Sequence, residues 1–593
     1  MGLKGLFTLL KDYHSIWFDL EKIQNRPVKL IIDGRTIANA IYSECRFDGL
    51  CGGQYTEFFE KVFRLFLNLR DFGFEILILM ECSKHESHDV DVFDRRMARW
   101  IQFKKSLRDC EAYNRLPVLG YHVFLKVANI LNIEIIPTDL DTSTTLVGIA
   151  KLLNAYVLTN RNDAYICDIP GVLALSYINW ESDYLEGHFY SFNSFLEFTN
   201  LETNYIPLLF LLSSPETYIT DPHCVQEVNE AFSNITSHSI PEGERIYFKR
   251  KFERALNYFK RKAHESYLSS YSLIKSKIDN RFHLMIDESL ELVKTRIFDP
   301  QKLSKLDTQK PYFGMDYSST LLGEDGLTFE LLFSLDYVYW GALGLNEQCV
   351  FISSRAENFT LDAAGLISQH IRSIIYGIIC PQKEYIKEHS RSKEPLSHKI
   401  DKVAPLTVYN GRKTPFHLLL PEMKEEDKIE FLFHSLNFDS STLSELPEYW
   451  YLPVVSVHYW LSQCTANVPE EIGKLLLLCF LACSNGEDHH VELLPLDTTR
   501  TVIYQRIDTA HYISEWEYVV SDIIALKSLL RIERLILAPE RLYNGLFFFS
   551  LLISQKFTDK VKNYLLENDK IVRIYELMSS LALSPIYNRK PNL

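Results

Sequence analysis

The stretch "VKLIIDGR", residues 28–35, decides the fold. A short aliphatic run that is followed at once by an acid and a glycine is typical of a buried strand that ends at Asp33. Other segments in the first 170 residues share this design: "FEILILMEC" ends near Glu81, "NIEIIPTDLD" ends at Asp139 and Asp141, and "AYVLTNRND" ends at Asp163. We therefore expect four buried strands, each with a carboxylate at its end.

Helical patterns lie between these strands. The segments "YTEFFEKVFRLFLNLRDF" (55–72) and "LPVLGYHVFLKVANIL" (116–131) repeat apolar residues every three and four positions. Alternation of strands and helices predicts a mostly parallel sheet flanked by helices, with right-handed crossovers. The carboxyl ends of parallel strands share one edge of the sheet, where ligands bind. The four acids should therefore converge at that edge.

Convergent carboxylates repel one another unless a positive charge lies between them. Divalent cations with oxygen ligands are the usual solution, and a pair of them can hold a phosphodiester for in-line hydrolysis. An acid at a strand end can instead cap the helix that follows it. Both interpretations remain open for any single acid, but four such strands in succession favour the metal site.

Size and composition narrow the class of protein. With 593 residues, the chain is too long for one core. Its net charge of −14 argues against nucleic-acid binding by the whole surface, although a local basic stripe could still bind. The 11 scattered cysteines indicate free thiols in a reducing compartment. The apolar runs "KLLLLCFLAC" and "GLFFFSLLIS" are too short to cross a bilayer. We expect an intracellular protein without a membrane span.

Several motifs in order resemble one family. They are "MGLKGL" at residues 1–6, "IIDGR" at 31–35, the strand ending at Glu81, and "DRRMARWIQFKKSLRD" at 94–109. This series resembles the XPG and flap-endonuclease superfamily, whose nuclease core is PIN-like. "GGQY" at 52–55, directly before a long helix, is similar to the asteroid branch. The resemblance implies a PIN-like nuclease domain that acts on branched or ended DNA, in repair or maintenance, and a nuclear location.

The resemblance also implies a two-metal site for Mg²⁺ or Mn²⁺. Its ligands would be Asp33, Glu81, Asp141, Asp163 and Glu216. Two further acidic positions of the family pattern hold Ser143 and Arg161 instead, so five of seven acids are kept. We therefore expect metal binding to be weakened or absent. Asp139 or Asp168 could supply a substitute oxygen.

Arg161 leaves several roles open. It could point away from the acids, or pair with Asp141 or Glu81 and stand in for a metal. It could also bind the scissile phosphate, because a guanidinium matches phosphate geometry well. We therefore place Arg161 with Asp33, Glu81, Asp141 and Asp163 as candidate catalytic residues.

Two basic stretches are candidates for nucleic-acid binding. In Asp91–Asp109, six basic residues outnumber three acids, with Trp100 and Phe103 interleaved. The resemblance makes this stretch a counterpart of the family's arch helix. With the N-terminal motif, it gives the candidate nucleic-acid contacts Gly2, Lys4, Arg95, Arg96, Arg99, Lys104, Lys105 and Arg108. The second stretch, Arg245–Lys262, has eight basic residues and one acid. Its apolar side, with Phe252 and Phe259, should face a core, leaving Lys249, Lys251, Arg254, Lys260, Arg261 and Lys262 outside.

We expect three parts in the chain. Residues 1–230 should form the nuclease-like domain, 231–382 a helical region with the basic amphipathic segment, and 403–593 a mainly helical, asteroid-type domain. The charged segment Lys383–Lys402 between the last two reads as a linker or exposed loop. The helical C-terminal region shows no catalytic pattern, which favours a scaffold or a surface for a protein partner.

Two other residue groups allow a metal interpretation. Cys479 and Cys483, with His489 and His490 downstream, could bind zinc, but two thiols one helical turn apart are more typical of a core helix. His85 and His88 near Glu81 are more typical of a polar loop. Two functions therefore remain: a divergent metal-dependent endonuclease on branched or ended DNA, or a catalytically silent protein that binds DNA or RNA.

Overall fold

The computed structural model describes residues 6, 10, 16–23, 27–81, 103, 114–138, 142–162, 164–213, 215–219, 221–232, 244–262, 267–300, 349–352, 356–379, 383–393, 397–406, 423–464, 468–485, 507–566, 568–583 and 586. The chain divides into two compact units. Unit 1 comprises 1–40, 64–81 and 132–314, and unit 2 comprises 41–63, 82–131 and 315–593.

A mostly parallel sheet forms the centre of unit 1. Its strands run in the order β1-β8-β6-β5-β2-β3-β4, with β7 paired to β8. Their bounds are β1 Trp17–Asp19, β2 Val28–Asp33, β3 Phe74–Glu81, β4 Glu134–Thr138, β5 Tyr156–Leu158, β6 Val172–Leu173, β7 Ile178–Asn179 and β8 Glu186–Tyr190. The pairings among β2–β6 are parallel, whereas β8 pairs antiparallel with β6, β1 and β7.

The four strands predicted from the sequence lie side by side and are all parallel. β2 lies between β3 and β5, and β4 pairs with β3. Leu30, Ile31 and Ile32 of β2 are fully or almost fully buried, as a central strand covered on both faces requires. The predicted fold class, an α/β domain with a mostly parallel sheet flanked by helices, is therefore confirmed.

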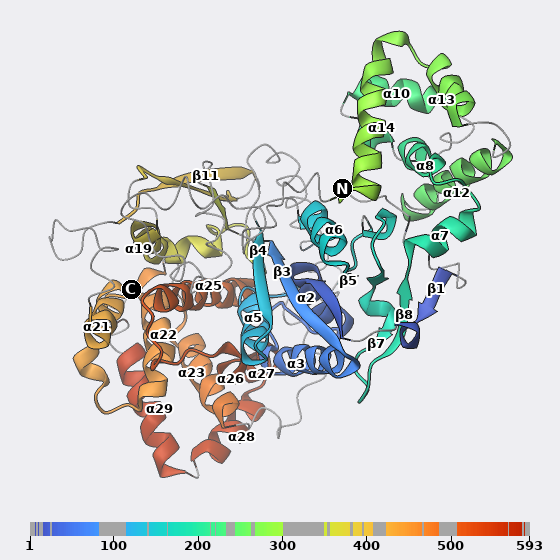
Figure 1. Ribbon diagram of the computed structural model, residues 1–593. Helices are drawn as coiled ribbons and strands as arrows, with labels where there is room; N and C mark the ends of the chain where they lie inside the picture. The colour runs from blue at the N-terminus through green and yellow to red at the C-terminus, as the bar shows by residue number, and fades with distance from the viewer. Residues whose placement is uncertain are drawn as a thin grey trace. The chain divides into compact units, whose positions relative to one another are not determined.

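Helices complete unit 1. Figure 1 shows a green group of helices that continues from α7 beyond the β8 side of the sheet. The helices that lie wholly in the unit are α6 Thr142–Leu153, α7 Phe192–Thr199, α8 Tyr205–Ser213, α9 Pro215–Tyr218, α10 Pro222–Ala231, α12 Glu244–Lys262, α13 Tyr267–Ser276 and α14 His283–Phe298. One hydrophobic core joins the sheet to α8, α12 and α14. The end of α2 (Gly34–Glu44) and the start of α3 (Tyr55–Phe72) belong to unit 2.

Helix α12 carries the second basic stretch. Phe252, Leu256 and Phe259 are buried in the core of unit 1, as the apolar spacing predicts. The expectation that Lys251 lies outside is wrong, since only 4% of this residue is exposed and its Nζ lies 3.5 Å from Asn229 Oδ1. A long aliphatic stem lets a lysine beside the apolar face bury its length and end on a polar partner.

Unit 2 is mainly helical, as predicted for the C-terminal region. The helices from α21 onward, in orange and red in Figure 1, follow α5 Gly120–Ile130, α19 and a small three-stranded sheet. The elements are β9 Cys349–Phe351, α19 Gln369–Ile379, β10 Ile386–Arg391, β11 His398–Val403, α21 Glu425–Ser435, α22 Tyr451–Gln463, α23 Glu470–Ser484, α25 Ile507–Leu529, α26 Pro539–Leu542, α27 Gly545–Ile553, α28 Gln555–Leu566 and α29 Asp569–Ala582. In the part of the chain that the structure describes, no helix combines the length and apolar character needed to cross a membrane.

The charged segment Lys383–Lys402 is not a linker or an exposed loop. It contains β10 and most of β11, which pair as an antiparallel hairpin. Glu388 of β10 is fully buried, and its two oxygens accept hydrogen bonds from Arg372 Nε at 2.6 Å and Nη2 at 2.8 Å. Arg372 Nη1 lies 3.0 Å from Asp522 of α25. Two charged residues of this segment, Glu388 and Arg391, are thus each paired with an opposite charge inside unit 2.

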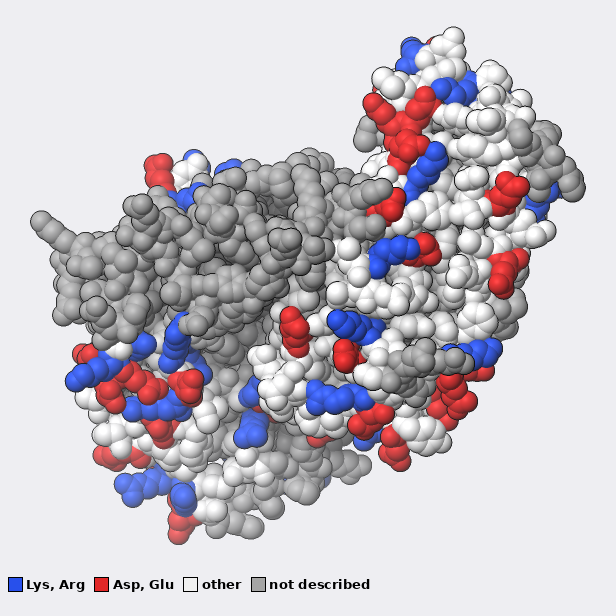
Figure 2. Space-filling view, viewed as in Figure 1, with Lys and Arg blue, Asp and Glu red and all other residues white. Residues whose placement is uncertain are grey.

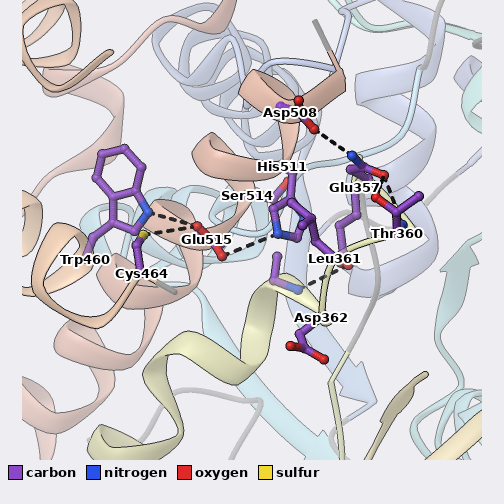
Figure 3. A network of polar contacts seen from close by, with 12 residues as sticks. Glu357, Thr360, Leu361, Asp362, Trp460, Cys464, Asp508, His511, Ser514 and Glu515 are labelled. Carbon is purple, nitrogen blue, oxygen red and sulfur yellow. Dashed lines mark hydrogen bonds and ion pairs between the residues drawn. The ribbon is translucent and has the colours of Figure 1, made fainter. Parts of the chain in front are cut away.

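A network of polar contacts connects α25 to α22 and to the segment that precedes α19 (Figure 3). Glu515 accepts from Trp460 Nε1 at 3.2 Å and from the Cys464 thiol at 3.3 Å, and its other oxygen lies 3.3 Å from His511 Nε2. Asp508 accepts a hydrogen bond from Asn358 Nδ2 at 2.6 Å. The contacts of Glu515 give partners to the buried Trp460 and His511, whereas the contact between Asn358 and Asp508 is exposed.

The "GGQY" segment packs against the start of α27 within unit 2. Gln54 forms an isolated β-bridge with Asn544, and Gly545 N donates to Gly53 O at 2.9 Å. The Tyr55 hydroxyl donates to the buried carboxylate of Glu517. Residues almost 500 positions apart in the sequence are therefore held together by backbone contacts.

This close approach predicts a specific effect of Gly545→Ala. An added Cβ would lie 2.6 Å from the carbonyl oxygens of Cys51 and Gly52, so backbone would have to shift. We expect a loss of about 1–3 kcal/mol in stability, measured by urea unfolding of the full chain. Gly473→Ala is the control, because its Cβ would meet only the flexible end of Leu583 at 2.7 Å. Equal urea midpoints for the two variants would contradict this packing.

Glu388 makes the stability of unit 2 depend on pH. Burial raises the pKa of this carboxyl, but the charge and hydrogen bonds of Arg372 outweigh burial, so the pKa lies below its usual 4.5. The resulting stability is present above about pH 4.5 and is lost as pH falls through the lowered pKa.

Glu388→Gln should therefore flatten the loss of stability in acid and cost roughly 3–5 kcal/mol at neutral pH. Urea unfolding at a series of pH values measures both effects, with Glu430→Gln on the exposed side of α21 as the control. An unchanged acid profile would contradict the role of this pair.

Candidate functional site

Asp33 is the last residue of β2, in the middle of the parallel sheet. Its side chain is fully buried. Helix α2 begins at the next residue, and the backbone N–H of Thr36 donates to Asp33 Oδ1 at 3.2 Å. Asp33 therefore caps α2, as proposed for a single acid at a strand end, while its second oxygen faces other donors.

Arg161 supplies the charge that neutralises Asp33. Its Nε donates to Asp33 Oδ2 at 2.7 Å and lies 3.2 Å from the Thr36 hydroxyl oxygen. The Arg161 side chain is 27% exposed, whereas that of Asp33 is 0% exposed. Of the alternatives considered from the sequence, a role as counter-ion fits this geometry, and Asp33 is a partner that was not considered there.

Thr159 connects the two charged residues. It follows β5 directly, and the pairing of Ile32 with Leu158 places Thr159 beside Asp33. The Thr159 hydroxyl donates to Asp33 Oδ2 at 3.0 Å and accepts from the backbone N–H of Arg161 at 3.1 Å. We name these four residues, Asp33, Thr36, Thr159 and Arg161, the Asp33 cluster.

Reasoning from the sequence did not single out Thr36 and Thr159, and only Thr36 leaves a local signal. Thr36 is three residues after Asp33, the spacing at which a capping side chain meets a backbone N–H. Thr159 is recognised only once the register of β5 against β2 is known, because its neighbour Asp33 is 126 positions away.

The other predicted ligands are described only in part. The backbone of Glu81 ends β3, in register with Thr138, and that of Glu216 lies in α9. Asp139, Asp141 and Asp163 lie outside the described residues, as do the candidate contacts Gly2, Lys4, Arg95, Arg96, Arg99, Lys104, Lys105 and Arg108 and the histidines His85, His88, His489 and His490. The parallel pairing brings the ends of the four strands to one edge, and the roles of these residues stay predictions.

The residues of two alternative metal sites considered from the sequence contact other protein groups. Asp168, considered as a replacement ligand, accepts a hydrogen bond from Lys151 Nζ at 2.5 Å. Cys479 and Cys483 are buried in α23, with their sulfurs 3.8 Å apart, which agrees with a core helix. Within the described ranges, no group of three or more His, Cys, Asp or Glu residues is arranged to hold a metal ion.

The arrangement around Asp33 does not fit a divalent cation. A cation needs oxygen lone pairs directed at it. Here, both carboxylate oxygens accept hydrogen bonds, from Thr36 N, Thr159 Oγ1 and Arg161 Nε. A metal at Oδ2 would also face the guanidinium, and at an effective dielectric near 20 two such charges about 4 Å apart repel by roughly 4 kcal/mol per unit charge.

Sequence relatives agree with the motif-based resemblance. The chain is 23% identical over 513 residues to mouse "Single-strand DNA endonuclease ASTE1", covering 81% of this chain and 73% of that protein. It is 21% identical over 565 residues to the zebrafish and human proteins of the same name, covering 87% of this chain and 76% and 80% of theirs. No protein-family model matches. The resemblance to asteroid proteins is therefore confirmed over most of the chain.

Structural comparison finds a DNA-processing enzyme. The catalytic core of Rad2 in complex with a DNA substrate aligns with a TM-score of 0.29 and 13% identity, over 50% of this chain and 86% of that one. A second structure of the Rad2 catalytic core aligns with a TM-score of 0.25. At these scores, the fold class depends on the strand pairing described above and not on the likeness.

The Asp33 cluster predicts the effect of Thr159→Val. Valine keeps the shape of the side chain but removes the hydroxyl that serves both Asp33 and the Arg161 backbone. We expect a loss of roughly 2 kcal/mol, measured by urea unfolding of the full chain. Thr159→Ser keeps the hydroxyl and should lose less, about 1 kcal/mol for the missing methyl group. A valine variant as stable as the natural chain would show that the hydroxyl contributes nothing.

Proposed function

We propose that this chain, a relative of the single-strand DNA endonucleases, recognises DNA with single-stranded ends or branches. Support comes from similarity to those proteins over 81–87% of the chain and from a parallel sheet with a buried acid at its ligand-binding edge. RNA is the alternative polymer. Action on DNA implies a nuclear protein with a role in repair or maintenance.

The Asp33–Arg161 ion pair favours binding over hydrolysis. Hydrolysis by the family's two-metal chemistry would use Asp33, Glu81, Asp141, Asp163 and Glu216 as ligands of Mg²⁺ or Mn²⁺, with Arg161 as a further catalytic candidate. In the Asp33 cluster, the first of these acids is neutralised by a side chain of the protein itself. The single observation that carries the choice of binding over hydrolysis is this pair, whereas DNA as the ligand is proposed from the sequence relatives.

Metal-dependent endonuclease activity is the second candidate. The names of the relatives favour it, as does the retention of five acids in the sequence. Its ligands would then be drawn from the acids other than Asp33, or Arg161 would have to leave Asp33. This candidate makes a different prediction for chelators and for Asp33→Asn, and so the two can be separated.

The basic stretch Asp91–Asp109 is the proposed DNA contact, together with Gly2 and Lys4. Phe103 of this stretch is buried, and its ring meets that of Phe359 at 5.7 Å within unit 2. On the face shown in Figure 2, acidic and basic side chains of the described residues are interspersed. We assign the DNA contact to this stretch because its six basic residues outnumber its three acids. The helical C-terminal region is proposed to bind a protein partner.

A direct test uses the full chain with flap, overhang and blunt duplex DNA. We expect flap and overhang DNA to bind with equal affinity in EDTA and in Mg²⁺, in gel-shift and anisotropy measurements. Incubation with Mg²⁺ or Mn²⁺ then tests cleavage. Cleavage that is abolished in Asp33→Asn would support the endonuclease and refute the silent protein, whereas absence of DNA binding would refute both.

Charge reversal of the basic stretch gives a quantitative prediction. Replacing Arg95, Arg96, Lys104 and Lys105 by Glu should weaken DNA binding and flatten its salt dependence by about 0.7–0.9 per lost phosphate contact. Affinities measured over a range of salt concentrations give this slope.

The matched control reverses four exposed basic residues on α28 and α29, namely Lys556, Lys560, Lys570 and Arg573. It changes the net charge by the same amount. If both variants lose affinity equally, the effect is one of net charge, and the assignment of the basic stretch is wrong.

A further inference from the structure

The buried carboxylate of Asp33 requires a positive partner. Moving an isolated carboxylate from water into a protein interior is unfavourable by several kcal/mol, even after relaxation. Asp33 is 0% exposed in the centre of the sheet, and Arg161 Nε lies 2.7 Å from its Oδ2. The protein therefore supplies from its own chain the charge that a bound cation would otherwise provide.

The guanidinium is held in place by more than this ion pair. Its Nε hydrogen is shared between Asp33 Oδ2 and Thr36 Oγ1, at 2.7 and 3.2 Å. The backbone N–H of Arg161 is bonded to Thr159 Oγ1, which itself donates to Asp33. The backbone and the side chain of Arg161 are thus both tied to the Asp33 cluster.

Two buried carboxylates of unit 2 are paired in the same way. Glu388 pairs with Arg372 at 2.6 Å, and Glu357 pairs with Arg391 at 2.6 Å. In each case, the acid is almost completely buried and the partner is an arginine. An arginine is suited to this role because its guanidinium keeps its charge when buried and is more weakly hydrated than an ammonium.

We propose that Arg161 is a built-in counter-ion that takes the place of a divalent cation at Asp33, so that the sheet edge is complete without metal there. The guanidinium and a divalent ion are alternatives for the same carboxylate oxygen. This proposal concerns stability and metal affinity, and it holds whether or not the chain binds DNA.

The first test is Mn²⁺ titration calorimetry of the full chain and of Asp33→Asn. We expect the same Mn²⁺ affinity for both, because Asp33 is not a ligand while Arg161 occupies it. Mn²⁺ binding that is strong in the natural chain and lost in Asp33→Asn would overturn the proposal.

The second test removes the counter-ion. Arg161→Gln should lower the melting temperature in EDTA by several degrees, and Mn²⁺ should restore part of it. Its Mn²⁺ affinity should rise about tenfold or more, which corresponds to about 1.4 kcal/mol. In Asp33→Asn/Arg161→Gln, both the loss in EDTA and the response to Mn²⁺ should disappear, because the Asp33 carboxylate is gone. If Arg161→Gln does not fold in EDTA, recovery of the fold in the double variant would equally support Arg161 as the counter-ion of Asp33.

Lys151→Gln is the matched control in unit 1. This change breaks the ion pair between Lys151 Nζ and Asp168 Oδ2, which lie 2.5 Å apart. Unlike Asp33, the two side chains of this pair are 31% and 41% exposed. The variant should change the melting temperature little and leave the response to Mn²⁺ unchanged. If Arg161→Gln behaves like this control, Arg161 is an ordinary surface charge, and the proposal is wrong.

Discussion

The ion pair between Asp33 and Arg161 is the constraint on which the candidate site depends. A fully buried carboxylate at the end of the central strand is stable only with a positive partner, and this partner comes from the residue three positions after β5. The pair also ties β2, the start of α2 and the chain after β5 to one another, through Thr36 and Thr159. Any metal at this edge must therefore be considered together with an arginine that already holds the first acid.

Much of the fold could be predicted because its signals are local. The four aliphatic runs and the helical repeats are legible within windows of 10–20 residues, and the structure has them as parallel strands and helices. The partner of Arg161 was not predicted, because Asp33 becomes its neighbour only through the register of Ile32 with Leu158. The β10–β11 hairpin was mistaken for a loop because Glu388 finds Arg372 16 positions away and Asp522 lies 134 positions further on, distances at which sequence pattern carries no information.

The sequence relatives bear on the substrate, whereas the geometry of the Asp33 cluster bears on metal binding. Similarity along most of the chain to proteins named single-strand DNA endonucleases favours action on DNA. In the proposal made here, Arg161 in the Asp33 cluster takes the place of a metal at the first acid of the site. Recognition and hydrolysis place different demands on this sheet edge, since binding needs a stable fold and a basic surface, whereas two-metal hydrolysis needs carboxylates free to coordinate cations.

Anomalous X-ray scattering from crystals grown with Mn²⁺ tests the central claim most directly, because it places the ion relative to Asp33. The account predicts no Mn²⁺ within coordination distance of either Asp33 oxygen, with Arg161 Nε still bonded to Oδ2. A Mn²⁺ ion bound to Asp33 with the Arg161 side chain turned away would contradict it.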